Sequence, residues 1–184
     1  MASNTSEFGA VQIAGRLAVP AERLDAPVDR VRCVLRCGQR YLLAQHNSRR
    51  RENLGKWGLP GGRLKSREEP RAALRRELIE ELGLRVTSLV EIGDWWHRGE
   101  NHRVFGCDVA EATQSFAPDE LLAIDWFEYT EISVLEADGR LKTGFELDAI
   151  TAFRVRFPRV EVRPSKPPRR PSAVTRLSSK RSRR

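Results

Sequence analysis

The sequence predicts an α/β domain in which a β-sheet lies between helices. Two segments of alternating apolar residues each turn at a glycine, Gly38 and Gly99, as β-hairpins do. Between them, residues 70–82 repeat leucine every fourth position, which is the period of a helix with one apolar face. Strand-forming and helix-forming segments that alternate along one chain are expected to pack as a sheet with helices against its faces.

The individual elements follow from local signals. Helix 70–82 starts at a proline, which suits a first helical position, and Gly83 is a natural C-terminal stop. A last helix is expected to cover the sheet face opposite helix 70–82. The elements expected in chain order are a hairpin (31–47), a strand that enters a glycine loop (54–64), the helix (70–82), a second hairpin (89–110), a strand (124–129), a connector (131–140) and a helix near 143–156.

Length and composition predict a single folded domain. A chain of 184 residues with 40% hydrophobic content can bury one sizeable core, and no segment repeats internally. We expect this domain at residues 29–160, after an N-terminal extension at residues 1–28. Residues 161–184 read as a disordered tail, because proline, serine and arginine dominate there and supply no core packing.

That tail carries the whole basic excess of the chain. Nine of the 33 Lys and Arg residues lie between Arg163 and Arg184, which leaves 24 basic against 25 acidic residues elsewhere. Such a tail could attract RNA, DNA or an acidic surface by releasing counterions. No aromatic residues alternate with these charges, which favours a solubilising extension over a nucleic-acid site.

A cytoplasmic protein without a membrane anchor is expected. Residues 1–28 contain three acids and lack a basic region followed by a long apolar run, so no signal peptide or spanning helix is predicted. Cys33, Cys37 and Cys107 fall in predicted strands without zinc-ligand spacing, and they read as reduced core thiols.

Acidic residues gather on helix 70–82 in a way that folding alone does not favour. At roughly 100° per residue, Glu77, Glu80 and Glu81 lie within an arc of about 100°. Glu77 and Glu81 are a like-charged i,i+4 pair, and the last turn of a helix disfavours negative charge. A hard divalent cation such as Mg²⁺ or Mn²⁺ would offset this repulsion, because it takes carboxylate oxygens as ligands. A solvated acidic face is the alternative reading.

Residues beside the helix suit a supporting role in a metal site. Gly61 and Gly62 let the backbone turn tightly and approach a ligand, and a carbonyl of Gly61 could join the metal. Glu68 is placed to hold a metal-bound water or an arginine, and Arg76 to orient a neighbouring carboxylate. The fixed positions of this segment are Gly62, Glu68, Arg76, Glu77, Glu80, Glu81 and Gly83.

The spacing of these positions resembles the Nudix box of the Nudix hydrolase family without a departure. By this resemblance the fold is an α/β/α sandwich around a mixed sheet. The implied reaction is hydrolysis of a nucleoside diphosphate linked to another group X, which gives a nucleoside monophosphate and phosphorylated X. The resemblance further implies that metal ions activate the attacking water and neutralise charge on the diphosphate.

The same resemblance suggests individual roles. Glu77, Glu80 and Glu81 would hold the metals, and Glu81 would be a direct ligand. The general base corresponds to Glu77 in some members and to a later loop acid in others, for which we select Glu120. The residues we consider for substrate binding are Arg51, Trp96, Phe105 and Phe127, although aromatic residues in strands more often belong to a core.

Several alternatives remain open on the sequence alone. Small substrates could be a nucleoside triphosphate, a nucleotide sugar or a dinucleotide. A hydrolase of RNA 5′-triphosphate ends would use the basic tail to dock RNA. A noncatalytic nucleotide sensor would fit a damaged box better than this intact one, and an isopentenyl diphosphate isomerase would need a catalytic cysteine that we do not find. Homodimers are frequent in the Nudix family, so the resemblance also allows a homodimer of this chain.

Overall fold

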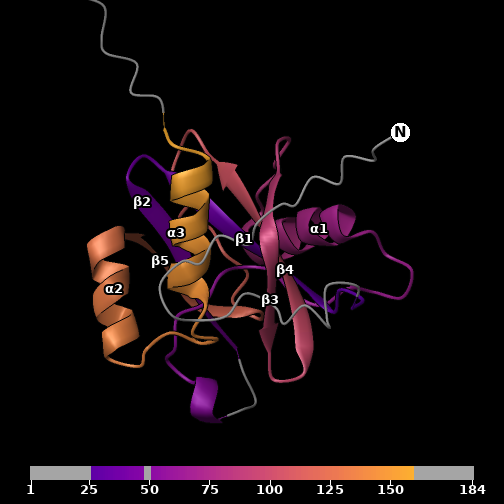
Figure 1. The fold of residues 1–184 in the computed structure, drawn as a ribbon, viewed down its shortest axis with the longest axis horizontal. Coiled ribbons are helices and arrows are strands. Elements are labelled where there is room, and N and C mark those ends of the chain that lie inside the picture. Colours follow the sequence, from indigo (N-terminus) through magenta and orange to yellow (C-terminus); the bar gives the residue numbers. More distant parts are fainter. Residues whose placement is uncertain (1–25, 48–50, 160–184) are drawn as a thin grey trace, which may run out of the picture.

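The computed structural model describes residues 26–47 and 51–159, which form a five-stranded sheet with helices on both faces (Figure 1). The predicted N-terminal extension lies almost wholly outside the described residues, and so does the predicted tail at 161–184. The expected α/β sandwich is confirmed, with a mixed sheet between its helices.

Both predicted hairpins are present in the sheet. Gly38 and Gly99 occupy their turns with φ of 63° and 82°, a conformation that glycine adopts without strain. The strand order is β3-β4-β1-β2-β5, in which β1 and β4 run parallel and the other neighbours run antiparallel. The strands are β1 (Arg30–Cys37), β2 (Arg40–His46), β3 (Val90–His97), β4 (Glu100–Asp108) and β5 (Leu121–Glu128).

The predicted helix at 70–82 is confirmed with the same bounds. Gly83 ends it with φ 63°, and its N–H donates to the carbonyl of Ile79. The described helices are α1 (Pro70–Leu82), α2 (Tyr129–Ala137), α3 (Glu146–Arg156) and the short 3₁₀ helix η2 (Arg51–Asn53). Figure 1 shows α2 and α3 together, with α1 on the other side of the sheet.

Alternate residues of β1 belong to two separate hydrophobic cores, one on each face of the sheet. Val31, Cys33 and Leu35 pack with the apolar face of α1, which includes Leu74 and other leucines. The intervening residues of β1 face α2 and α3, where Val34 joins the second core. Arg32 lies on this second face as well, and its side chain is buried. The strand therefore presents an arginine to the layer that contains α3.

The glycine loop inserts between β1 and β2. Its carbonyls at Pro60 and Gly62 accept from the N–H groups of Cys33 and Val31, and Gly58 exchanges two hydrogen bonds with Ala44. We predicted a regular strand leading into this loop, and that prediction was wrong: residues 54–64 form only isolated bridges.

The chain between β5 and α3 also departs from the prediction. Residues expected to form a connector instead form α2, which starts with a reciprocal capping box between Glu128 and Glu131. Strand β5 begins at Leu121, because its pairing with β2 continues to His46. Helix α3 begins at Glu146, three residues later than Thr143, because segment 140–142 pairs with Trp57.

The three cysteines lie in strands with free thiols, and Cys33 and Cys107 are buried, as predicted. Burial raises the pKa of both buried thiols, so they are less reactive than an exposed cysteine. Among the described residues, no helix is long and apolar enough to cross a membrane.

Replacing Leu74 with alanine tests whether the α1 core holds the helix that carries the acids. The Leu74 side chain is fully buried, so we expect the substitution to lower the free energy of unfolding by about 2–5 kcal/mol. Leu54→Ala is the control: that leucine is 52% exposed, and we expect a change within about 0.5 kcal/mol. Urea denaturation measures both, and equal losses would contradict the assignment of this core.

Candidate functional site

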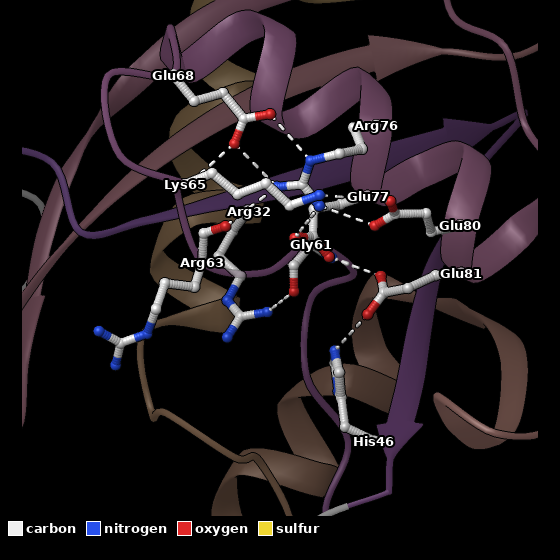
Figure 2. A network of polar contacts seen from close by, with 10 residues as sticks. All are labelled: Arg32, His46, Gly61, Arg63, Lys65, Glu68, Arg76, Glu77, Glu80 and Glu81. Atoms are coloured by element: carbon white, nitrogen blue, oxygen red, sulfur yellow. Dashed lines mark hydrogen bonds and ion pairs between the residues drawn. The ribbon is translucent and has the colours of Figure 1, made fainter.

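Arg76 connects three of the four acids singled out from the sequence. Its guanidinium forms a fork with Glu68, with Nε and Nη2 each 2.9 Å from a carboxylate oxygen. Nη1 donates to Glu77 at 2.8 Å and to Glu80 at 2.7 Å (Figure 2). These contacts lower the pKa of Glu68 to about 2 and raise the pKa of Arg76. Arg76 is thus the cation that keeps these acids together.

Glu81 points away from Arg76 and into the protein. Its side chain is 3% exposed, and Oε2 accepts from the backbone N–H of Gly61 at 2.7 Å. Oε1 lies 3.3 Å from Nε2 of His46, at the end of β2, although the geometry does not meet that of a hydrogen bond. Burial lowers the pKa of His46, which favours the neutral imidazole beside this carboxylate.

The backbone of Gly61 contacts two buried side chains of opposite charge. Its N–H donates to Glu81, and its carbonyl accepts from Nη1 of Arg32. Gly61 has φ 118°, and a Cβ there would overlap the carbonyl oxygen of Val31. Only glycine suits this position, because both the backbone conformation and the close approach to β1 exclude a side chain.

Gly62 leaves the space that the Glu77 carboxylate fills. A Cβ on Gly62 would overlap all three terminal atoms of that side chain. Burial raises the pKa of Glu77, while the contact with Arg76 acts in the opposite direction. The absence of a side chain on Gly62 therefore allows the Glu77 carboxylate of α1 to pack against the glycine loop.

The donor set fits a hard divalent cation. Carboxylate oxygens are the ligands that Mg²⁺ and Mn²⁺ prefer, and a nitrogen of Arg76 already bridges Glu77 and Glu80 in the position of a cation. Within residues 26–47 and 51–159, no three acidic, histidine or cysteine side chains are arranged so that they could hold one metal ion together. Glu77 and Glu80 share Nη1 of Arg76, whereas Glu81 accepts from the backbone N–H of Gly61.

The other residues considered from the sequence lie apart from this group. Glu120 is exposed in the turn before β5, and no contact joins its carboxylate to the acids of α1. Arg51 is exposed on η2. Phe105 is fully buried under Arg71, so a substrate cannot reach its ring. Phe127 packs against the core at the edge of Trp57.

Trp96 is half-buried on β3, opposite Asn101 of β4. Its neighbour Trp95 packs toward the α3 layer, where its ring stacks on Phe145. Side chains of adjacent strand residues point to opposite faces, so Trp96 is directed away from that layer. Trp96 therefore lies on the face of the sheet that α1 covers, on the edge strand β3.

Sequence reasoning missed Arg32 and Lys142, which lie beside the glycine loop, and it left His46 open between a surface residue and a substrate contact. Segment 140–142 pairs with Trp57: the N–H of Trp57 donates to Arg140, and the N–H of Lys142 donates to Trp57. Arg32 alternates with apolar residues in β1 and reads as a solvent-facing strand residue. Its burial follows only from the α3 layer, which no local pattern reveals.

Replacing Gly62 with alanine tests the fit between the glycine loop and Glu77. The added Cβ displaces the carboxylate, so we expect Mn²⁺ affinity, measured by calorimetry, to fall by about 10–100-fold. The backbone of Gly62 does not require positive φ, so the thermal midpoint should change little. Gly93→Ala is the control, since a Cβ there makes ordinary contacts with Trp95. Unchanged Mn²⁺ affinity in Gly62→Ala would contradict this role.

Comparisons with known proteins place this geometry in context. The family model described as NUDIX domain matches residues 26–146. The putative 8-oxo-dGTP diphosphatase 2 of Mycobacterium tuberculosis is 56% identical over 43 residues, which are 23% of this chain and 30% of that protein. The chain thus matches less than a third of that relative's length.

Solved structures agree on the fold. A NUDIX hydrolase from Nitrosomonas europaea superposes with a TM-score of 0.56 at 24% identity, over 71% of this chain and 90% of that one. The E. coli ORF135 protein superposes with a TM-score of 0.52 at 25% identity, over 71% and 93% of the two chains. The matched NUDIX model covers more than half of the sequence, including the glycine loop and the acids of α1, and the chain belongs to the NUDIX family.

Proposed function

We propose that this protein is a divalent-metal-dependent hydrolase that cleaves the diphosphate linkage of a nucleoside diphosphate linked to X. The products are a nucleoside monophosphate and phosphorylated X. The observation that carries the proposal is the acidic face of α1 against the glycine loop, where Gly61 and Gly62 fit Glu81 and Glu77. Arg76 completes this arrangement through its contacts with the other acids.

Glu77, Glu80 and Glu81 would hold Mg²⁺ or Mn²⁺. The Gly61 carbonyl, expected from the sequence as a further ligand, accepts from Arg32 in this structure and would have to leave that contact to join the metal. When bound, the metal neutralises charge on the phosphates and lowers the pKa of water. The chain contributes orientation: the N–H of Gly61 fixes one oxygen of Glu81, and Glu68 holds Arg76 by a two-bond fork. Carboxylates held in this way need less reorganisation to bind a cation.

Two acids are proposed for the general base. Glu120 lies on the turn before β5, and this turn approaches the end of α1 because the N–H of Ala117 donates to the carbonyl of Glu81. Glu77 is the alternative, since burial raises its pKa and brings it nearer to that of an efficient base.

A nucleoside triphosphate is the substrate class that the Mycobacterium tuberculosis relative suggests, by its description as a putative 8-oxo-dGTP diphosphatase. The intact acids argue for catalysis over nucleotide sensing. Free cysteines accord with a reducing compartment such as the cytoplasm. Contacts of the basic segment after Arg163 with nucleic acid, and a homodimer, remain proposals from the sequence.

Glu81→Gln tests the proposed function directly. The substitution keeps an acceptor for Gly61 but removes a negative charge, so we expect the fold to persist and turnover to fall by about 10³-fold or more. Phosphate release with Mg²⁺ or Mn²⁺ from nucleoside triphosphates, nucleotide sugars and dinucleotides measures it. Glu111→Gln, at an exposed position after β4, is the control. Full activity of Glu81→Gln would exclude this site.

A comparison of Glu120→Gln with Glu77→Gln separates the two proposed bases. Loss of the base should lower kcat by about 10²–10⁴-fold and remove the acid limb of the pH–rate profile. Glu77→Gln should also weaken metal binding, whereas Glu120→Gln should leave Mn²⁺ affinity unchanged. If Glu120→Gln retains kcat and the acid limb, the base is not Glu120.

A further inference from the structure

A buried histidine beside the acids of α1 has no hydrogen-bonding partner. His46 is the last residue of β2, and its side chain is 12% exposed. Within the described residues, neither Nδ1 nor Nε2 of its ring makes a hydrogen bond, although both atoms are buried. Buried polar groups are nearly always paired in folded proteins, and an ion or a water at the site is one explanation for an exception. The imidazole therefore has a capacity to bind that the protein itself does not use.

The ring of His46 faces one oxygen of Glu81. Oε1 of that carboxylate lies 3.3 Å from Nε2 of His46, whereas Oε2 accepts from the backbone N–H of Gly61 at 2.7 Å. Figure 2 shows Glu81 between Gly61 and His46, with one oxygen directed to each. His46 and Glu81 thus present one nitrogen and one oxygen to the same small volume.

The separation of these two atoms suits ligands of one metal ion. A carboxylate oxygen and an imidazole nitrogen each lie about 2.1 Å from a bound transition metal, so two such ligands at a right angle are about 3.0 Å apart. The observed 3.3 Å is close to this value, yet the contact between His46 and Glu81 lacks hydrogen-bond geometry. A cation that both atoms bind accounts for a close pair that is not hydrogen-bonded.

Backbone contacts hold this pair in place. The N–H of Asn47, which follows His46, donates to the carbonyl of Glu120 in the turn before β5. The N–H of Ala117, in the same turn, donates to the carbonyl of Glu81 at the end of α1. The ends of α1 and β2 are therefore fixed relative to each other, which suits a site that two elements share.

Charge nearby limits what these two residues can hold alone. Arg32 and Lys142 both lie close enough to act on the His46 imidazole electrostatically, and they oppose a further cation. Glu81 supplies a single negative charge against them. The remaining negative charge has to come from the other acids of α1 and from substrate phosphates, with water in the open positions. This agrees with the lack, among the described residues, of three side chains already arranged around one ion.

Resting on the proposed hydrolase function, we infer that His46 is a nitrogen ligand of the metal ion that Glu81 binds. Mg²⁺ selects oxygen ligands, whereas imidazole binds transition metals, and the affinity of such sites rises from Mn²⁺ to Co²⁺. The protein therefore takes a transition metal in preference to Mg²⁺. The carboxylates alone do not decide this preference, because Mg²⁺ and Mn²⁺ both suit oxygen ligands.

Pulsed EPR of bound Mn²⁺ tests the ligand without catalysis, because it detects nitrogen nuclei that are bonded to the metal. The untagged protein is kept in excess over Mn²⁺, without substrate. The chain contains three histidines, so single variants assign the signal. We expect an imidazole nitrogen signal in the wild type and in His97→Gln, and its loss in His46→Gln. His97 is the matched control because it is also partly buried but lies on β3, with its ring against Phe145.

Metal affinity provides the second arm. Calorimetry should show that His46→Gln weakens Co²⁺ binding about tenfold or more and Mg²⁺ binding by less than about twofold, with His97→Gln unchanged for both. A structural role of His46 alone would change the affinities for both metals equally.

The wild-type spectrum already decides whether any nitrogen is bonded to the metal, even if His46→Gln does not fold. No saturable Mn²⁺ binding, bound Mn²⁺ without a nitrogen signal, or a signal that His46→Gln retains would overturn the inference. Absence of metal-dependent turnover in the wild type would instead overturn the proposed function, whatever the EPR spectra show.

Discussion

The contacts of one guanidinium hold the acidic face of α1 together. Arg76 donates to Glu68, Glu77 and Glu80, and without it these carboxylates would repel one another near a helix end that disfavours negative charge. Because Arg76 is itself fixed by a fork with Glu68, it holds the neighbouring carboxylates in defined places. The cluster is thereby kept negative and ordered, which is the condition that a site for a hard cation needs.

The glycine loop ties this local cluster to the rest of the sheet. By inserting between β1 and β2, it places Gly61 between Glu81 on the α1 layer and Arg32 on the α3 layer. The N–H of Gly61 donates to the Glu81 carboxylate, and its carbonyl accepts from the Arg32 guanidinium. Glu81 is therefore held in one orientation by the loop before any cation binds.

Local signals in the sequence predicted much of this fold. Helix α1 and both hairpins follow from leucine spacing and turn glycines, and the acids of α1 follow from residues within one segment. The loop insertion and the burial of Arg32 could not be predicted in this way, because they join distant residues: Arg32 meets the Gly61 carbonyl 29 positions away. Helix α2 was missed because Glu128 occupies its N-cap, where the usual sequence signal is Ser, Thr, Asp or Asn.

A crystal structure with Mn²⁺ and a nonhydrolysable nucleoside triphosphate, located by anomalous scattering, is the most direct test of the account. We predict Mn²⁺ on carboxylates of Glu77, Glu80 and Glu81, with Arg76 retained by Glu68 and the phosphates of the nucleotide on the metal. Mn²⁺ bound away from α1 would contradict the account.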